Sequence, residues 1–223
     1  MRTYSYTICN GAVVKHIFTG NNPSLQTEAS DLLVQIQLQV LLRYQTDGAW
    51  AATGSYFAHI AGQGQDAVPW SDAPQCLSQA REFLSSRGLY GELETFDVNK
   101  LVTLAWSGSA GGKKGSVIYA KASPVALLCL GTDTTFSLVP RSGFGGDTVV
   151  SGRSSENKKS SQGVGSSGHG PKAKASTASG GKTSEAIRVN LVHGDVLLLQ
   201  GDDFEYSLTR TGTAMVLIGS AAT

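Results

Sequence analysis

The sequence is poor in the residues that usually carry chemistry, with four histidines and three cysteines among 223 residues. The cysteines, Cys9, Cys76 and Cys129, are odd in number and widely spaced. They fit neither a zinc pattern nor a disulfide scaffold, so we expect small buried side chains in a reducing compartment. No spacing of serine, cysteine, histidine and acid indicates a nucleophilic catalytic set.

Net charge and long apolar runs are also lacking. The formal net charge is +1, so the chain has no overall basic character of the kind that a dedicated nucleic-acid coat shows. No apolar run approaches the roughly 20 residues that a membrane span needs. Hydrophobic residues make up 40% of the chain, enough for one sizeable core. We therefore predict a single domain spanning residues 1–223 with no membrane partner.

Acidic residues are absent before Glu28, while Arg2 and Lys15 are basic, which weakly resembles a mitochondrial presequence. The run Val13–Phe18 is nevertheless more typical of a first strand, and no secretory segment is evident. We expect an intracellular protein, and the sequence does not distinguish mitochondrion, cytoplasm and nucleus.

Short apolar runs separated by glycine, serine and lysine dominate the chain from residue 95 onward. Such strands indicate a β-sandwich or barrel, and strands are also expected within 44–60. The predicted strands are Val98–Trp106, Ser116–Ala120, Val125–Leu130, Thr135–Val139, Ile187–Leu191, Val196–Gln200, Phe204–Thr209 and Ala214–Ile218.

Two segments earlier in the chain have helical features. Residues 23–43 fit a strand alternation and a helical repeat equally well, with Asn22 or Ser24 as a potential N-cap. Ser71 or Asp72 can begin a second helix that runs through Arg87, with the following glycine as its C-cap.

Residues 141–186 interrupt the strand pattern. Serine, glycine, lysine, alanine and threonine dominate this segment, which cannot bury enough apolar surface to offset the entropy of ordering it. We predict a flexible, mildly basic insertion within the domain. Its basic residues and a lysine pair in a glycine-rich stretch are the candidate nucleic-acid contacts: Lys113, Lys114, Arg153, Lys158, Lys159, Lys172, Lys174 and Lys182.

His193-Gly194-Asp195 has the His-x-Asp spacing that supplies two ligands of a non-haem iron site. The third ligand would have to come from a distant histidine, and none follows His193. A tight turn before the strand Val196–Gln200 explains the same residues more simply, and we prefer that interpretation.

The second half of the chain resembles the AlkB-type iron/2-oxoglutarate dioxygenases. Pro124–Gly131 with Phe136–Leu138 is similar to the family's P-I-v-s-l-S-L-G … F-x-l stretch, and Leu191–Gly201 to its L-x-H-G-D-l-l-v-m-x-G stretch. Phe96–Trp106 lies where the family has its F-N-x-x-L-x-N-x-Y stretch, and Pro69-Trp70 followed by a short helix matches the usual order of parts. The resemblance implies a mainly β (α+β) fold, a double-stranded β-helix or jelly roll with N-terminal supporting helices. It therefore favours the helical alternative for residues 23–43.

The family's iron ligands have no counterpart in this sequence. The His-x-Asp pair implied by the resemblance should lie within residues 107–132, which contain no histidine, aspartate or glutamate. The family's distal histidine falls on Ser207 or Leu208.

The 2-oxoglutarate anchors are absent as well. The family's asparagine and tyrosine correspond to Leu104 and Trp106, and no arginine or lysine follows Arg210 to bind the cosubstrate carboxylate. We therefore expect no catalytic, cofactor-binding or metal-binding residues and no cofactor.

Three functions follow from these observations. The first is a non-catalytic AlkB-like domain, a pseudoenzyme that serves as a binding or scaffold subunit of a larger assembly with protein partners and RNA or DNA. The second is an active iron/2-oxoglutarate dioxygenase that demethylates nucleic acid or protein with unusual ligands, such as His193, Asp195 and His59. The third is a protein–protein module with no nucleic-acid role. We favour the first.

Overall fold

The computed structural model describes residues 2–7, 13–20, 22–48, 50–90, 96–107, 117–118, 124–140, 186–200 and 204–221. All of them belong to one compact unit, Met1–Phe144 with Ser184–Thr223. The predicted insertion 141–186 lies outside the described residues except for Ala186, and so does Cys9.

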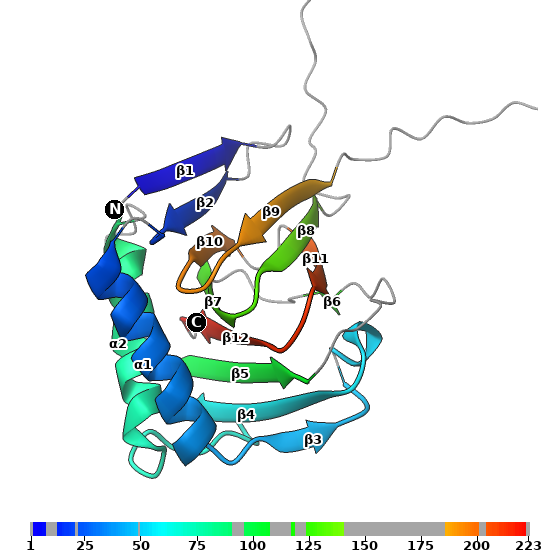
Figure 1. Ribbon diagram of the computed structural model, residues 1–223. Coiled ribbons are helices and arrows are strands. Elements are labelled where there is room, and N and C mark those ends of the chain that lie inside the picture. Colours follow the sequence, from blue (N-terminus) through cyan, green and yellow to red (C-terminus); the bar gives the residue numbers. More distant parts are fainter. Residues whose placement is uncertain are drawn as a thin grey trace, which may run out of the picture. The chain divides into compact units, whose positions relative to one another are not determined.

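The described residues form two α-helices, one short 3-10 helix and twelve strands (Figure 1). In chain order these are β1 Arg2–Thr7, β2 Val13–Phe18, α1 Pro23–Gln39, β3 Arg43–Gln45, η1 Ala51–Thr53, β4 Tyr56–Gly62, α2 Gln75–Tyr90, β5 Lys100–Trp106, β6 Val117–Ile118, β7 Pro124–Gly131, β8 Thr134–Pro140, β9 Ile187–Leu191, β10 Val196–Gln200, β11 Phe204–Arg210 and β12 Ala214–Ser220.

The strands form two antiparallel sheets in which the chain passes repeatedly from one sheet to the other. The large sheet has the order β1-β2-β10-β7-β12-β5-β4-β3, and the small sheet has the order β6-β11-β8-β9. The four central strands of the large sheet, β10, β7, β12 and β5, face the four strands of the small sheet. Along the chain the two sets are interleaved, because β6, β8, β9 and β11 of the small sheet fall between strands of the large sheet. This interleaving is that of a double-stranded β-helix, so the predicted fold class is confirmed.

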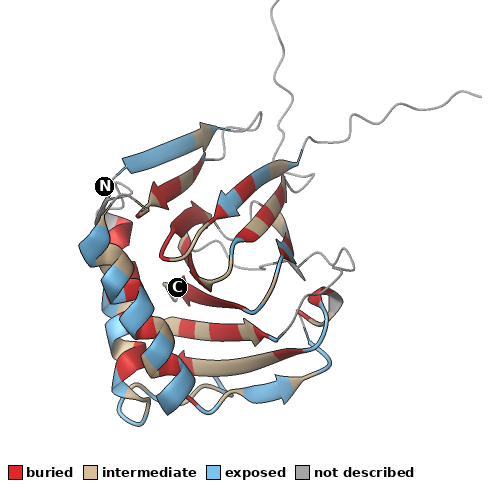
Figure 2. Ribbon diagram, in the orientation of Figure 1, coloured by how far each residue is buried: buried red, intermediate tan, exposed pale blue. Residues whose placement is uncertain are grey.

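The large sheet lies between two apolar layers, with the helices on one face and the small sheet on the other (Figures 1 and 2). Strand β7 shows the arrangement. Its residues Val125, Leu127 and Cys129 belong to the cluster between the sheets, whereas Ala126, Leu128 and Leu130 belong to the cluster under the helices. Because both faces are buried, β7 is a continuous apolar run rather than an alternating one.

Helix α1 resolves the ambiguity of residues 23–43. The Asn22 side chain accepts hydrogen bonds from the amides of Ser24 and Leu25, and Pro23 occupies the first turn. The buried residues Ala29, Leu32 and Ile36 follow the helical repeat, whereas Val34 and Leu38 of the competing strand pattern are 52% and 79% exposed. The helical interpretation is therefore confirmed.

Helix α2 is displaced toward the C-terminus relative to the prediction, because it begins at Gln75 and ends at Tyr90. The expected C-cap at Gly88 is wrong, since Gly88 lies inside the helix. A Cβ atom on Gly88 would lie 2.5 Å from Cβ of Phe96, so the glycine serves close packing and does not end the helix. Neither described helix is long and apolar enough to cross a membrane.

Strand β1 was not predicted from the sequence. It pairs with β2 over its whole length, from Arg2 opposite Phe18 to Thr7 opposite Val13. Nearly all of its residues are exposed, because β1 is the edge of the large sheet. Such a strand carries no apolar periodicity by which the sequence could reveal it.

Candidate functional site

The space between the two sheets is filled with apolar side chains. Trp106 of β5 is central to it, with Trp50 and Tyr56 at ring-centroid distances of 6.3 and 6.4 Å. The buried residues of this interior are Val14, Trp50, Tyr56, Leu104, Trp106, Val125, Leu127, Cys129, Phe136, Leu138, Val189, Leu191, Leu197, Leu199, Phe204, Leu208, Val216 and Ile218.

The positions singled out by the resemblance lie in this interior. Leu104 and Trp106 alternate along β5 toward the small sheet, and each is 1% exposed. Leu208 of β11, one of the two positions for the distal histidine, is buried at 4% exposure. Apolar side chains therefore occupy three of these positions, whereas Ser207, the other position for the distal histidine, is polar and partly buried.

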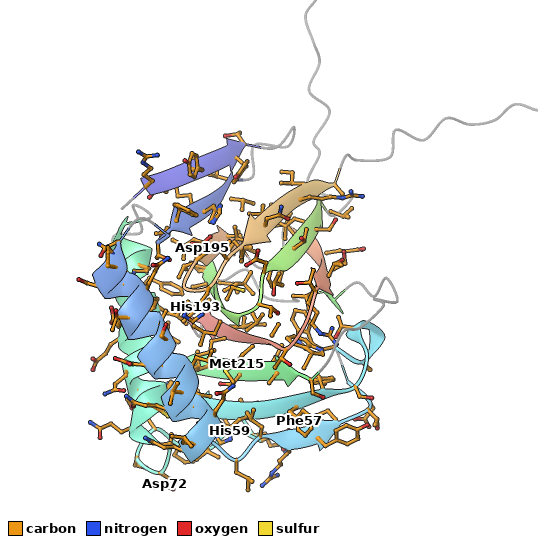
Figure 3. The ribbon with its side chains drawn as sticks, viewed as in Figure 1. Phe57, His59, Asp72, His193, Asp195 and Met215 are labelled. Atoms are coloured by element: carbon orange, nitrogen blue, oxygen red, sulfur yellow. The ribbon has the colours of Figure 1, made fainter. Side chains whose placement is uncertain are left out.

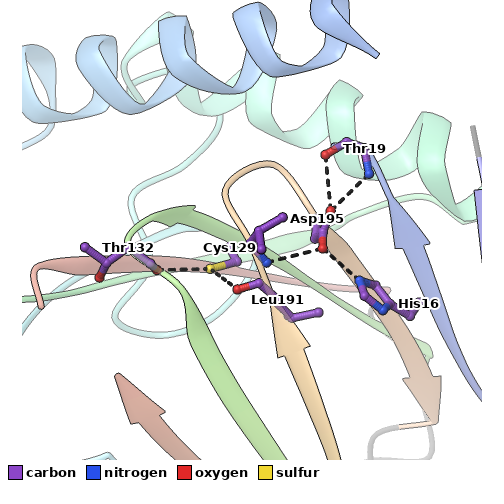
Figure 4. Close-up of polar contacts among 7 residues, drawn as sticks. His16, Thr19, Cys129, Thr132, Leu191 and Asp195 are labelled. Carbon is purple, nitrogen blue, oxygen red and sulfur yellow. Dashed lines mark hydrogen bonds and ion pairs between the residues drawn. The ribbon is translucent and has the colours of Figure 1, made fainter. Parts of the chain in front are cut away.

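Asp195 has a structural role in the turn before β10 (Figure 4). The carboxylate is fully buried, and its Oδ1 accepts hydrogen bonds from the Thr19 amide at 3.0 Å and the Thr19 hydroxyl at 3.3 Å. Its Oδ2 accepts from the Val192 amide at 3.2 Å and from Nε2 of His16 at 2.8 Å. Both oxygens are thus engaged in joining β2 to the turn.

The hydrogen bonds of His193 determine its tautomer. The Gly131 amide donates to Nδ1 at 3.0 Å, so Nδ1 carries no proton. Nε2 lies 3.0 Å from Oγ of Ser30, whose hydroxyl donates to the Gln26 carbonyl. The proton is therefore on Nε2, and neither ring nitrogen has a free lone pair. Burial lowers the pKa of His193, which agrees with a neutral ring.

His59 is not brought to His193 and Asp195 (Figure 3). It lies on β4, separated from β10 by β5, β12 and β7 in the large sheet. Four strand spacings correspond to about 19 Å, far beyond the span of one metal site. Among the described residues, no group of three or more histidines, cysteines, aspartates and glutamates could hold a metal ion. The described donors therefore do not fit the iron site that the resemblance implies.

The two cysteines within the described ranges are buried and free, as expected. Cys129 lies in the interior, where its Sγ is 3.7 Å from the carbonyl oxygens of Leu191 and Thr132 (Figure 4). Burial raises the pKa of this thiol to about 11. A thiol that stays protonated at neutral pH is a poor nucleophile and a poor metal ligand.

A groove of about 690 Å³, here called the edge groove, lies at the β3 edge of the large sheet. Four of its lining residues are polar or charged, namely Arg43, Gln45, His59 and Asp66, and the others are Leu41, Trp50, Tyr56, Ala58, Ile60, Val68, Val102 and Leu104. The volume suits a small molecule, and a mostly apolar lining with a few polar groups is typical of ligand sites. The groove could not be predicted from the sequence, because β3, β4 and β5 must pair and loop residues must pack beside them before it exists.

The comparisons with known proteins identify the fold. No family model matches the chain, and no curated protein matches it either. The solved structure of OsALKBH1, an AlkB homologue, superposes with a TM-score of 0.53 over 93% of this chain and 97% of that chain. The fold is AlkB-like. The sequence identity is 10%, so the similarity shows the fold alone.

The predicted nucleic-acid contacts lie in two segments of the chain. Lys113 and Lys114 lie in 108–116, and the other six candidates, from Arg153 to Lys182, lie in 141–185. Both segments are outside the described residues.

Proposed function

We propose that the chain is a non-catalytic AlkB-like domain that acts as a binding or scaffold subunit of a larger, RNA-associated assembly. The observation that carries the proposal is the packed interior. Leu104, Trp106 and Leu208 occupy positions where the family places polar groups, and each is at least 96% buried. None of these side chains is a ligand for iron, and their one donor, Nε1 of Trp106, is taken by the Thr53 hydroxyl.

The chemistry of the remaining donors supports the same proposal. Residues 107–132 contain no histidine, aspartate or glutamate. The hydrogen bonds of His193 leave no free lone pair on its imidazole. Both carboxylate oxygens of Asp195 accept hydrogen bonds from β2 and the turn, so a metal would have to displace those donors. A ligand set that includes these residues would therefore have to break the side-chain contacts that hold the turn before β10 against β2, β7 and α1.

Two surface features support a binding role. At the end of α1 and just after it, Val34, Leu38 and Leu41 are 52%, 79% and 78% exposed. Val34 and Leu38 lie one turn apart on the same face of α1, and exposed apolar side chains that are neighbours are typical of protein contacts. The edge groove offers a second surface, with charged Arg43 and Asp66 among its lining residues. The RNA association rests on the basic residues of the insertion and on the nucleic-acid substrates common in the AlkB family.

Anaerobic calorimetry on the purified full chain tests the lack of catalysis. Iron(II) and 2-oxoglutarate are titrated separately and together, beside a known iron/2-oxoglutarate dioxygenase as the positive control. We expect no saturable heat from this chain. Stoichiometric binding of both would refute the proposal and favour the active dioxygenase, with demethylation assays as the next step.

RNA association is tested separately. Binding of a labelled RNA is measured at low and high salt for the natural chain and for a variant with the six insertion residues changed to glutamine, from Arg153 to Lys182. A control variant carries Arg2→Gln, Lys100→Gln and Arg188→Gln, outside the insertion and outside the edge groove. We expect salt-sensitive binding that only the insertion variant loses. No binding at low salt would refute the RNA association. Protein partners that persist in a pull-down after nuclease treatment would then favour a protein–protein module.

A further inference from the structure

Strand β1 leaves one edge of the large sheet unpaired. It is the terminal strand in the sheet order, and no helix or strand of the described ranges pairs with its outer side (Figure 1). Its residues pair one-to-one with β2, from Arg2 opposite Phe18 to Thr7 opposite Val13, so no bulge turns this edge away. A regular edge strand presents a row of unused amide and carbonyl groups that can pair with another strand.

The opposite edge of the same sheet is protected. Strand β3 has only three residues and carries an exposed charge on Arg43. Beyond β3, a loop residue closes the edge of β4: the Val68 amide donates to the Ile60 carbonyl at 2.9 Å, and the Val68 carbonyl accepts from the Gly62 amide at 2.8 Å. Short strands, charges and covering loops are the usual protection of a sheet edge. Strand β1 is twice as long as β3, and its single charged residue, Arg2, stands at its end.

The side chains of β1 suit a strand that is paired on both sides. After Arg2 the strand consists of threonine, tyrosine and serine, with neither lysine nor proline, and threonine and tyrosine favour strands. Tyr6 packs against the cluster between the sheets. Tyr4 is 47% exposed, and its ring centroid lies 6.3 Å from that of His16. Tyrosine is enriched at protein interfaces, so the half-exposed Tyr4 ring is a suitable contact residue.

We propose that β1 pairs with β1 of a second copy of this chain, antiparallel about a two-fold axis, and joins the two large sheets into one. The axis is normal to the sheet, so opposite residues lie on the same face and their numbers have an even sum. Tyr4 lies opposite Tyr4 of the second copy, which places Arg2 opposite Tyr6. Thr3 then lies opposite Ser5. The proposal does not rest on the absence of catalysis.

Every opposite pair in this register is favourable. The two Tyr4 rings can stack on each other, Arg2 can lie against the Tyr6 ring, and Thr3 can form a hydrogen bond with Ser5. The two Arg2 side chains are offset by four residues, about 13 Å, which exceeds the Debye length of about 8 Å at physiological ionic strength. Opposite residues are both even or both odd, so their outward amide and carbonyl groups meet whichever alternate set faces outward. The edge is therefore complementary to itself.

Sedimentation equilibrium of the purified full chain, between about 1 μM and 1 mM, is the first test. We expect the average mass to rise with concentration from that of one chain to twice that value and to go no higher, because a two-fold contact closes on itself. A chain that stays monomeric over the whole range would overturn the proposal and leave the edge to an extended segment of another protein. Growth beyond the dimer would overturn it as well.

Two matched double variants test the register. Thr3→Glu with Ser5→Glu places carboxylates opposite each other across the two-fold axis, whereas Thr3→Lys with Ser5→Glu places opposite charges there. Both variants carry the same change beside Lys15, which lies opposite Ser5 within the chain. We expect the dimer of the first variant to have a dissociation constant at least about tenfold higher than that of the second. Equal dissociation constants would place the contact elsewhere and overturn the proposal.

Crosslinking covers the case in which charged residues on β1 disturb folding. Tyr4→Cys and Thr7→Cys are each made in a chain with Cys9→Ser, in which the other two cysteines, Cys76 and Cys129, are buried. A short thiol crosslinker is added to the native protein. We expect covalent dimers of Tyr4→Cys and none of Thr7→Cys, because Thr7 is offset from its own copy by six residues, about 20 Å. Equal crosslinking of the two variants, or none of Tyr4→Cys, would overturn the proposal.

Discussion

The packed interior makes a quantitative prediction for Trp106→Ala. Trp106 is 1% exposed, contacts the rings of Trp50 and Tyr56, and donates from Nε1 to the Thr53 hydroxyl. Removing a fully buried tryptophan costs about 3–5 kcal/mol, from lost transfer energy and from the cavity left behind. For a domain of this size each kcal/mol lowers Tm by about 2–4 °C, so we expect a fall of roughly 6–20 °C.

Urea denaturation followed by circular dichroism measures the effect. Two further variants serve as comparisons for the loss of stability. Trp106→Phe keeps most of the ring and loses the hydrogen bond, so we expect it to cost about 1–2 kcal/mol. Trp70→Ala removes a partly buried tryptophan on the helix side of the sheet and should cost less than Trp106→Ala. If Trp106→Ala destabilised the domain no more than Trp70→Ala, the ring would lie in a roomy pocket, and the argument for a packed interior would fail.

Three further predictions follow. First, the pKa of His193 is lowered in the folded chain from 6.5, so its contribution to stability is complete above pH 6.5 and is lost as the pH falls toward the folded value. The unfolding free energy should decrease over that range, and a fall of the same size in His193→Gln would contradict this. Second, Gly88→Ala should destabilise the domain by about 1–3 kcal/mol, despite the better helix propensity of alanine, because its Cβ meets Phe96; thermal unfolding beside Ser85→Ala measures it. Third, Cys129, with a pKa raised to about 11, should resist a thiol reagent at pH 8 until the chain unfolds; rapid labelling in the native state, located by peptide mapping, would show that its burial is wrong.

Most strands could be predicted from local sequence. The predicted Ile187–Leu191 and Val196–Gln200 agree with the structure at both ends, and β7 differs by one residue at each end. Apolar runs bounded by glycines and polar turns suffice to locate these strands, because hydrophobic periodicity and turn residues are local properties of the sequence. Strand β1 and the true end of α2 were missed, since an exposed edge strand has no apolar pattern and Gly88 is explained only by its contact with Phe96.

The sequence by itself determined the apolar runs that alternate between the two sheets, the absence of acids and histidines from 107–132, and the tight turn before β10. Only the tertiary structure decided that Asp195 binds Thr19 and His16, that the edge groove exists, and that Arg210 is buried against Trp106 and Thr53. The reason is separation along the chain. His16 lies 179 residues from Asp195, and Thr53 lies 157 residues from Arg210. Residues so far apart meet only when the sheets close, and no local pattern encodes which partners they find.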